Sequence, residues 1–517
     1  MASSYLAPGV YMEEVSSGSR PIEAVGTAVA AFVGFAERGP LHEPVLVTNW
    51  TQFRQNFGDF VEGFYLAHAV YGYFQNGGGT AYVVRVGGEG APSGSDNGGG
   101  NGQMALPAAE LPAAGPDAKP GLTISARNPD AGDLAVEVAP ASEEGDDTFR
   151  LVVKQGGQTV ETFDNVTAKR GPHHVGTIVA KQSKLIALDD TKSTAVALPK
   201  KDAAVALVPS SPPPAKVSAA SYVGDPIDRT GLGGFEAIDE ITMVLAPDLM
   251  SAYQHGLIDA EGVKAVQLAM IAHCELMSDR VAVLDPPPGL NSQQVKEWRT
   301  EFAGYDTKYG ALYWPWVQVM DQSSGNRISV PPSGHVAGVW ARSDETRGVH
   351  KAPANEVLRG VVSLHTVISR AEQEQLNPLG INCMRAFPGQ GIRVWGARTL
   401  SSDPEWRYVN VRRLFNFIEE SILNGTNWVV FEPNDAYLWE SVRRVVGAFL
   451  QRIWRSGALV GRSASEAYYV KCDEENNPPE SRDAGNLFIE IGVAPVKPAE
   501  FVVFRISQMP QGAALEE

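Results

Sequence analysis

Two low-complexity segments divide the chain and limit how it can fold. Residues 87–121 are rich in glycine, serine, alanine and proline, and residues 209–221 carry a run of prolines, "PSSPPPAKVSAAS". Such compositions bury too little apolar surface to offset the loss of chain entropy, so both segments are predicted to be linkers. The chain must then fold in separate parts around them, as several domains are expected for 517 residues.

The sequence between the linkers, residues 122–208, has the pattern of a small β domain. The runs "LAVEVAP", "TFRLVVKQGG" and "QTVETFDNV" alternate apolar with polar residues and are separated by turn residues. We therefore predict a β-rich module that is inserted into a larger domain.

The two stretches that flank this insert, residues 21–86 and 222–374, alternate short apolar strands with longer helices. The predicted strands are 81–86, 241–247 and 280–287, and the predicted helices are 66–74, 261–277 and 292–302. Such alternation predicts a parallel sheet that is covered on both faces. The main domain is expected to be α/β and to be assembled from both sides of the insert.

A third domain, α+β in class, is predicted to begin at residue 375 and to run to residue 517. Residues 411–423 and 441–456 have helical periodicity, and "NWVVFEP" between them has the composition of a buried strand. The tail "NLFIEIGVAPVKPAEFVVFRIS" contains two strand-like runs, and the first places four apolar residues on one face: Leu487, Ile489, Ile491 and Val493.

A short strand-like run at residues 10–15 stands alone near the start of the chain. Pro8 and Gly9 precede it, "SSGS" follows it, and no neighbouring strand is available to pair with it. Residues 1–20 are therefore predicted to be a separate N-terminal strand and linker.

Charge is unevenly distributed along the chain. The net charge of −17 argues against general nucleic-acid binding, because phosphate requires a basic surface. Between residues 385 and 462, however, eleven arginines, no lysine and seven acidic residues give a local charge of +4, against −21 elsewhere. In the helix predicted for 441–456, Arg444, Arg452 and Arg455 lie opposite the apolar stripe. These arginines either meet an acidic partner or form a solvated face with internal ion pairs.

One segment resembles part of a catalytic site. "SGHVAGVWA", residues 333–341, resembles the histidine segment of subtilisin-like proteases, in which His335 would be the general base. The nearest counterpart of the serine motif is "GTAVAAFVG", where Ala28 stands at the nucleophile position and precedes the histidine. We therefore expect no enzyme, no catalytic residue, no metal and no cofactor. A serine hydrolase that uses His335 is the alternative.

The cysteines and the N-terminus indicate the compartment. Cys274, Cys383 and Cys472 are far apart and odd in number, which suits reduced protein better than a disulfide framework. The N-terminus lacks a basic start followed by an apolar region, and no apolar run reaches the ~18 residues of a membrane span. The sequence predicts a cytoplasmic protein.

Longer segments resemble a known family. "YLAPGVYMEEVSSGSRPIEAVGTAVAAFVGFAERGP" near the start, and "LWESVRRVVGAFLQRIWRSGALVG" and "EIGVAPVKPAEFVVFRI" in the C-terminal third, are similar to contractile tail sheath proteins. These proteins occur in phages, R-type bacteriocins and phage-tail-like injection systems. The resemblance covers nearly the whole chain, and the insert is its most weakly matched part.

The resemblance implies a structural subunit of a contractile particle. Sheath protomers stack as helical rings, expected to be hexameric, around an inner tube in a metastable extended state, and contract to drive the tube through a target envelope. The implied core is subtilisin-like without catalysis, the insert lies outside, and the C-terminal domain forms the inner layer. The implied partners are further copies, the tube, the baseplate and terminator or cap proteins, with neither nucleic acid nor membrane insertion. Assembly is expected in the cytoplasm of a producing bacterium, in a particle that is then released as a phage, a bacteriocin or an injection system.

The resemblance also implies which residues join the protomers. In this family, terminal strands are exchanged between neighbours, and a helix with basic residues touches the tube. A strand gains its hydrogen bonds at an exposed sheet edge even when the edge belongs to another chain. The expected tube-facing residues are Arg444, Arg452 and Arg455. The expected strand-exchange residues are Val10, Tyr11, Met12, Phe501, Val503, Phe504 and Arg505.

Overall fold

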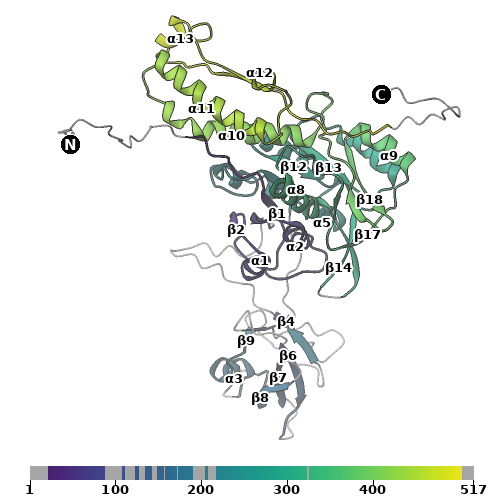
Figure 1. Ribbon diagram of the computed structural model, residues 1–517. Helices are drawn as coiled ribbons and strands as arrows, with labels where there is room; N and C mark the ends of the chain where they lie inside the picture. Colours follow the sequence, from purple (N-terminus) through teal and green to yellow (C-terminus); the bar gives the residue numbers. More distant parts are fainter. Residues whose placement is uncertain are drawn as a thin grey trace, which may run out of the picture.

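The computed structural model describes most of the chain in three parts. It covers residues 21–87, 108–110, 123–126, 134–142, 148–155, 158–169, 171, 173–189, 204–207, 217–322 and 325–503. Figure 1 shows an α/β core, an inserted β domain apart from it, and a C-terminal layer of two long helices. Five residues with predicted roles, Val10, Tyr11, Met12, Phe504 and Arg505, lie outside the described residues.

A nine-stranded sheet forms the core. Its strands are β1 (Val29–Gly34), β2 (Val45–Val47), β3 (Thr80–Arg85), β11 (Met243–Leu245), β12 (Val281–Leu284), β13 (Gly310–Trp314), β16 (Glu356–Val357), β18 (Ile381–Phe387) and β19 (Gly391–Val394). Their spatial order is β16-β19-β18-β13-β12-β11-β1-β3-β2. Neighbours from β3 to β18 are parallel, whereas β2, β19 and β16 join antiparallel at the two edges. The predicted parallel sheet is thus correct for the centre, and the whole sheet is mixed.

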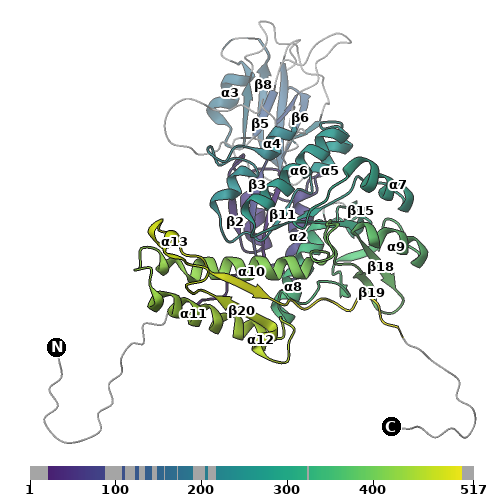
Figure 2. The same ribbon diagram turned by 90° about the horizontal axis from the view of Figure 1, so that it is seen from above.

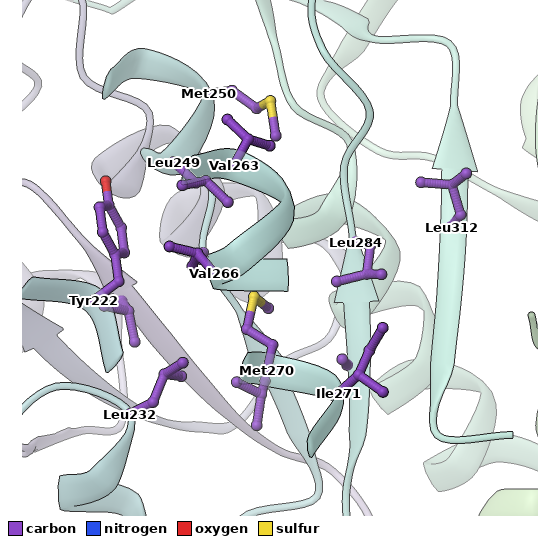
Figure 3. Close-up of a cluster of buried hydrophobic side chains, with 14 of the residues drawn as sticks. Tyr222, Leu232, Leu249, Met250, Val263, Val266, Met270, Ile271, Leu284 and Leu312 are labelled. Carbon is purple, nitrogen blue, oxygen red and sulfur yellow. The ribbon is translucent and has the colours of Figure 1, made fainter. Parts of the chain in front are cut away.

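Both faces of this sheet are buried, as predicted. Helices α5 (Leu249–Gln254), α6 (Ala260–Met277) and α7 (Ser292–Glu297) cover one face, where Val263, Val266 and Met270 pack near Leu284 and Leu312 (Figure 3). Helices α1 (Trp50–Phe57), α2 (Leu66–Asn76) and α8 (Ser333–Arg347) cover the other face. Successive strand residues point to opposite faces, so a strand that is buried on both sides is apolar throughout.

Glycines allow α2 and α8 to cross at close range. A Cβ at Gly334 would lie 2.4 Å from the carbonyl oxygen of Ala69, and one at Gly338 would lie 2.4 Å from that of Tyr73. Any larger residue would force the helices apart. The glycines of "SGHVAGVWA" therefore serve helix packing.

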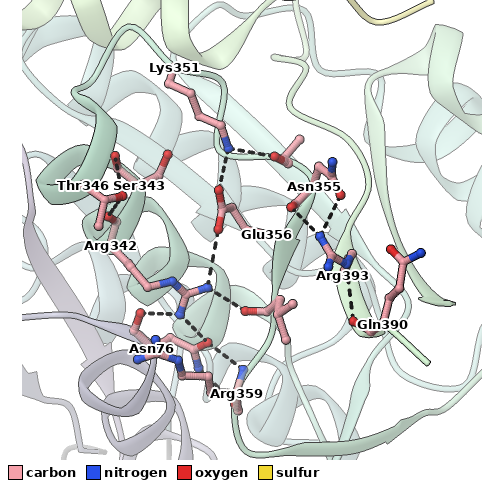
Figure 4. Close-up of polar contacts among 12 residues, drawn as sticks. Asn76, Arg342, Ser343, Thr346, Lys351, Asn355, Glu356, Arg359, Gln390 and Arg393 are labelled. Carbon is pink, nitrogen blue, oxygen red and sulfur yellow. Dashed lines mark hydrogen bonds and ion pairs between the residues drawn. The ribbon is translucent and has the colours of Figure 1, made fainter. Parts of the chain in front are cut away.

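Polar contacts join these helices to the far edge of the sheet (Figure 4). The Arg342 guanidinium donates to the backbone oxygens of Asn76, at 2.8 Å, and of Val357, at 2.6 Å. The Asn76 side-chain oxygen accepts the backbone N–H of Arg359 at 2.8 Å. Because these backbone groups are satisfied, the chain around β16 is held against α2 and α8.

The predicted start of the third domain, residue 375, is too early. Strand β18 pairs in parallel with β13, with Ile381 opposite Leu312, and β19 returns antiparallel to β18. The core sheet therefore extends to Val394. The prediction missed this because the pairing joins residues about 70 positions apart; the helix that precedes β18 is α9 (Arg370–Leu376).

Two other local predictions change. "NWVVFEP" is not a buried strand: it forms a short 3-10 helix, Asn427–Val429, and then a turn with Val430 and Phe431 exposed. It connects two packed helices and has no sheet to join. The helix predicted for 292–302 is α7 followed by a π-helical segment, Trp298–Ala303.

The insert is β-rich, with one four-stranded and one three-stranded sheet. Its apolar core takes alternate residues of β6 and β7. Strand β4 falls inside the first predicted linker, and helix α4 (Ala219–Val223) begins inside the second. The insert contains β4 (Ala108–Glu110), β5 (Thr123–Ala126), β6 (Leu134–Pro140), β7 (Thr148–Gln155), β8 (Gln158–Thr167), α3 (Val175–Gln182), β9 (Ile186–Asp189) and β10 (Ala204–Leu207).

Smaller elements complete the described chain. A three-stranded sheet, β15-β14-β17, lies beside the core. The elements are η1 (Gly233–Ala237), β14 (Val317–Met320), β15 (Arg327–Val330), β17 (Val361–Leu364), η3 (Asn377–Leu379), α10 (Val409–Gly425), α11 (Ala436–Arg455), α12 (Ala464–Ala467), β20 (Tyr468–Lys471), α13 (Pro479–Asp483) and β21 (Glu490–Val493).

Candidate functional site

The C-terminal domain carries most of the residues that the sequence singled out. Helices α10 and α11 lie side by side, and the hairpin β20–β21 packs on them (Figure 2). The predicted apolar stripe of α11 is buried there, and the apolar face of the tail, Leu487 to Val493, packs against the same cluster as predicted. Strands β20 and β21 form a sheet of two within the described chain. Each strand therefore keeps an outer edge with no strand beside it in that part of the protein.

The N-terminal segment is anchored on the two helices. Ile22 is buried against α10, so closely that a Cβ at Gly425 would lie 2.6 Å from its side chain. The Arg452 guanidinium donates to the carbonyl oxygen of Ile22 at 2.5 Å, and the N–H of Val25 donates to the Ser421 hydroxyl at 3.2 Å. The chain that precedes residue 21 thus departs from a fixed point.

The C-terminal segment is anchored on the core domain. After β21, the N–H of Val496 bonds the carbonyl oxygen of Ala458 at 3.1 Å. The Glu500 carboxylate then accepts from Arg398 at 2.9 and 2.6 Å, from Asn377 at 2.7 Å and from Tyr408 at 3.1 Å. Burial raises the pKa of Glu500, but these hydrogen bonds outweigh it and hold the pKa below its usual value. Bidentate pairing with arginine is a strong form of ion pair, so Glu500 is firmly held.

Three exposed apolar residues follow this anchor. Phe501, Val502 and Val503 are 75%, 69% and 78% exposed and belong to no strand. Two of them, Phe501 and Val503, are predicted strand-exchange residues. A run of consecutive exposed apolar side chains next to a rigid anchor is typical of a segment that is covered in an assembly.

The structure separates the three predicted arginines of α11. Arg444 and Arg455 are exposed and form no ion pair with the described residues, and the guanidinium of Arg444 lies 3.4 Å from the Ser441 hydroxyl on its own helix. Arg452 instead binds the backbone of Ile22. Two of the three predicted arginines, Arg444 and Arg455, therefore form an exposed basic face on α11. The third, Arg452, is bound to the backbone of Ile22.

Two arginines of α10 have roles that the sequence did not predict. Arg412 lies between aromatic rings, with its guanidinium 4.8 Å from Tyr309 and 4.6 Å from Trp406. Arg413 pairs with Asp344 of α8 at 2.5 Å, and the two side chains are only 3% and 4% exposed. Arg412 also forms an ion pair with Glu419 at 2.8 Å, so both arginines of α10 are engaged within the protomer. Asp344 and Tyr309 lie about 70 and 100 residues earlier in the sequence, so no local spacing could reveal these two contacts. Trp406 and Glu419, which also contact Arg412, are close to it in sequence.

A cavity of about 250 Å³ lies where the N-terminal segment, the core and α10 meet. Four carboxylates line it: Asp239, Glu240, Asp279 and Glu420. Burial, followed by nearby Asp279 and Asp239, raises the pKa of Glu420. Among the described residues no group of histidines, cysteines and carboxylates is arranged to hold a metal ion.

His335 does not form a catalytic site. Its ring is buried against α2, where a Cβ at Gly72 would lie 2.6 Å from Nδ1, and Nδ1 has no hydrogen-bond partner among the described residues. The nearby Ser333 hydroxyl donates to Asp285 at 2.5 Å and so is engaged elsewhere. A general base must reach a nucleophile and its substrate, and this imidazole is enclosed by packed helices.

His335 should instead make the core sensitive to acid. Burial, together with neighbouring His68, lowers the pKa of His335 to about 4 from its usual 6.5. A lowered histidine pKa contributes stability above pH 6.5 that is lost as the pH falls towards 4, at about 1.4 kcal/mol per pH unit. In H335Q, the free energy of unfolding in urea should therefore fall less steeply between pH 6.5 and pH 5. The control H365Q, at an exposed histidine, should keep the wild-type slope, and equal slopes in all three proteins would contradict the assignment.

Two family models match adjacent parts of the chain. The phage tail sheath protein central domain matches residues 243–400, and the phage tail sheath C-terminal domain matches residues 401–509. Together they cover more than half of the sequence. Among the residues that the structure describes, no helix has the length and apolar character needed to cross a membrane.

Relatives from several phages are similar in sequence. The tail sheath protein of Burkholderia phage BcepMu is 25% identical over 98% of this chain and 97% of its own. The tail sheath protein of Vibrio phage KVP40 is 27% identical over 43% of this chain and 36% of its own. A putative prophage major tail sheath protein of Pseudomonas aeruginosa is 25% identical over 48% of this chain and 62% of its own. The chain thus spans less than two thirds of the last two relatives and nearly all of the first.

Solved structures share the fold along almost the whole chain. The helical sheath of the anti-feeding prophage in the contracted state aligns with a TM-score of 0.58 and 24% identity, over 98% of this chain and all of that one. The PVC sheath complex of an extracellular contractile injection system, also contracted, aligns with a TM-score of 0.57 and 22% identity, over 98% and 99% of the two chains. The mixed α/β multidomain fold described above is therefore shared with these structures.

Proposed function

The chain belongs to the phage tail sheath family, and we propose that it is the sheath subunit of a contractile, phage-tail-like particle. Copies polymerise as stacked helical rings around an inner tube and contract to drive that tube through a target envelope. The subunit is structural and not catalytic. The observation that supports this most directly is that both ends of the described chain are anchored, at Ile22 and at Glu500, and that exposed apolar residues follow the second anchor.

We propose that these ends are exchanged between neighbouring protomers. The N-terminal arm, residues 1–20, starts from Ile22 on α10 and α11, and the C-terminal arm, residues 501–517, starts from Glu500 on the core. The outer edges of β20 and β21 offer backbone groups to which an arm can add as a strand. The residues proposed to form these joints are Val10, Tyr11, Met12, Phe501, Val503, Phe504 and Arg505.

Anchoring the two arms on different parts of the protomer has a mechanical consequence. The N-terminal arm starts from the helical layer and the C-terminal arm from the core sheet, so the core can rotate while the joints persist. A head-to-tail contact repeated in this way produces an open helical array. A difference of about one to a few kcal/mol per protomer between two packings would add up over many copies to drive contraction.

The other parts take the places implied by the family. The domain division is proposed as an N-terminal arm, a subtilisin-like core that has lost catalysis, an outward insert between two linkers, and an inner C-terminal layer. Hexameric rings, a baseplate at one end and a terminator or cap at the other complete the particle. Assembly takes place in the cytoplasm of the producing bacterium before release.

We propose that the exposed face of α11 meets the inner tube. Arg444 and Arg455 supply the positive charge of this face and form no ion pair with the described residues. Arg452 adds positive charge at the edge of the face, because one nitrogen of its guanidinium is hydrogen-bonded to the carbonyl oxygen of Ile22. Desolvated arginines on such a face select an acidic partner and repel a basic one.

Electron microscopy of the purified full-length chain tests the proposed function. Negative-stain images should show tubes or stacked rings whose abundance rises with protein concentration, since helical polymerisation is cooperative. Particles that stay monomeric at all concentrations, with or without a tube protein, would contradict a sheath.

A further inference from the structure

The turn between α10 and α11 carries an unusual residue. Phe431 has an exposed fraction of 103% and a backbone φ of 68°. A bulky side chain with positive φ is strained, because Cβ crowds the following carbonyl. The isolated protomer gains nothing from placing a strained aromatic residue in water. Strain of this kind points to a function in contact with something else.

The turn holds Phe431 in a defined position. The N–H of Glu432 bonds the carbonyl oxygen of Val429 at 3.2 Å, and Trp428 and Val429 pack inward on the C-terminal cluster. Val430 and Phe431, the next two residues, point outward. The aromatic ring is therefore presented on an ordered turn, which reduces the entropy lost when it docks.

Further exposed residues extend this apolar end along α11. Leu423, at the end of α10, and Tyr437, in the first turn of α11, are both exposed. Tyr437 precedes Arg444 by seven residues and Arg455 by eighteen, which correspond to about two and five helical turns. Tyr437, Arg444 and Arg455 thus lie on one face of α11, which has an aromatic side chain at its N-terminal end and basic side chains further along.

We propose that Phe431, with Leu423, Val430 and Tyr437 around it, is an apolar anchor that inserts into a pocket on the inner tube. The tube surface would be apolar at this pocket and acidic along the part that faces Arg444 and Arg455. This inference rests on the proposed contact between α11 and the tube and adds an apolar anchor at one end of it. A few residues that fill well-packed pockets, often aromatic ones, commonly carry most of the binding energy of an interface.

The tube is favoured over a second copy because of where the contacts between copies lie. Those contacts were assigned above to the two arms and to the edges of β20 and β21, none of which includes the turn at Phe431. The turn is instead continuous with the basic face of α11, whose complement is an acidic surface.

Two variants of Phe431 test this proposal without harming the fold. Glycine and asparagine both accept a positive φ, so F431G and F431N should melt at the wild-type temperature or above it. Co-expressed with the tube protein of the same particle, each variant should give at least a tenfold loss of tube-filled extended sheaths in negative-stain images. Each should still form empty sheath polymers when expressed alone. The matched control is I227N, in the core domain, where the side chain is 89% exposed, and it should behave as wild type.

Each other outcome has a definite meaning. Wild-type numbers of tube-filled particles in F431G would overturn the anchor, and so would the loss of empty polymers, since Phe431 would then contact another copy. The double variant R444E/R455E separates the anchor from the proposed function. If it keeps the tube while F431G loses it, the arginine contact is wrong and the anchor stands. If both variants lose the tube, both contacts are supported.

Discussion

Deleting residues 2–17 is expected to leave a folded protomer that no longer forms long polymers. The deletion ends before Ile22, whose buried side chain and bonded carbonyl hold the N-terminal segment on α10 and α11. The apolar clusters of the described protein contain no residue before Ile22, so the free energy of unfolding should change by no more than about 0.5 kcal/mol. The strand that we propose is exchanged would be absent, and each proposed joint would lose its row of backbone hydrogen bonds.

A shorter deletion provides the control for this experiment. Removing only residues 2–9 leaves the strand-like run 10–15 and the serine-rich connector, so this variant should polymerise. Sedimentation velocity gives the polymer distribution, and urea unfolding gives the stability of each protomer. Polymers of normal length in the longer deletion would exclude strand exchange through Val10, Tyr11 and Met12.

The periodicity of the sequence predicted the centre of the fold but not its edges. Strands such as β12, apolar throughout, and helices such as α6 are long or regular enough to be identified locally. The β18–β19 hairpin belongs to the core sheet because β18 pairs in parallel with β13, about 70 residues earlier, and no local pattern contains that information. "NWVVFEP" shows a related limit of prediction from composition. Its apolar residues suit a buried strand, but they also suit the observed turn, in which Trp428 and Val429 pack inward and Val430 and Phe431 are exposed.

The candidate site was predictable only in part, for a similar reason. The isolated run 10–15 and the apolar tail can be identified in the sequence, and the family resemblance predicted that both are exchanged between protomers. The anchors are not visible: Ile22 meets Arg452 across 430 positions, and Glu500 meets Arg398 across 102. Arg452 has the same helical placement as a free surface arginine, and only its contact with Ile22 distinguishes it from Arg444. The strain at Phe431 is a backbone property that no residue pattern displays.

Replacing Arg413 with methionine is expected to have the largest effect on stability, a loss of about 3–5 kcal/mol. The substitution leaves the Asp344 carboxylate, 4% exposed, without its cation, and an uncompensated buried charge is costly. It also removes the donor at 2.8 Å from the carbonyl oxygen of Thr27, so the N-terminal segment loses a contact with α10. Urea unfolding followed by circular dichroism measures the change.

The double variant R413M/D344N shows whether this loss comes from the unpaired charge. Asparagine removes the charge that methionine leaves behind, so the double variant should be less destabilised than the sum of R413M and D344N, by about 1–3 kcal/mol. Additive losses would mean that the two side chains stabilise the protein independently. Because Arg413 connects α8 of the core, α10 of the C-terminal domain and the N-terminal segment at Thr27, R413M should also shorten the polymers. D344N, which keeps the bond from Arg413 to Thr27, should shorten them less.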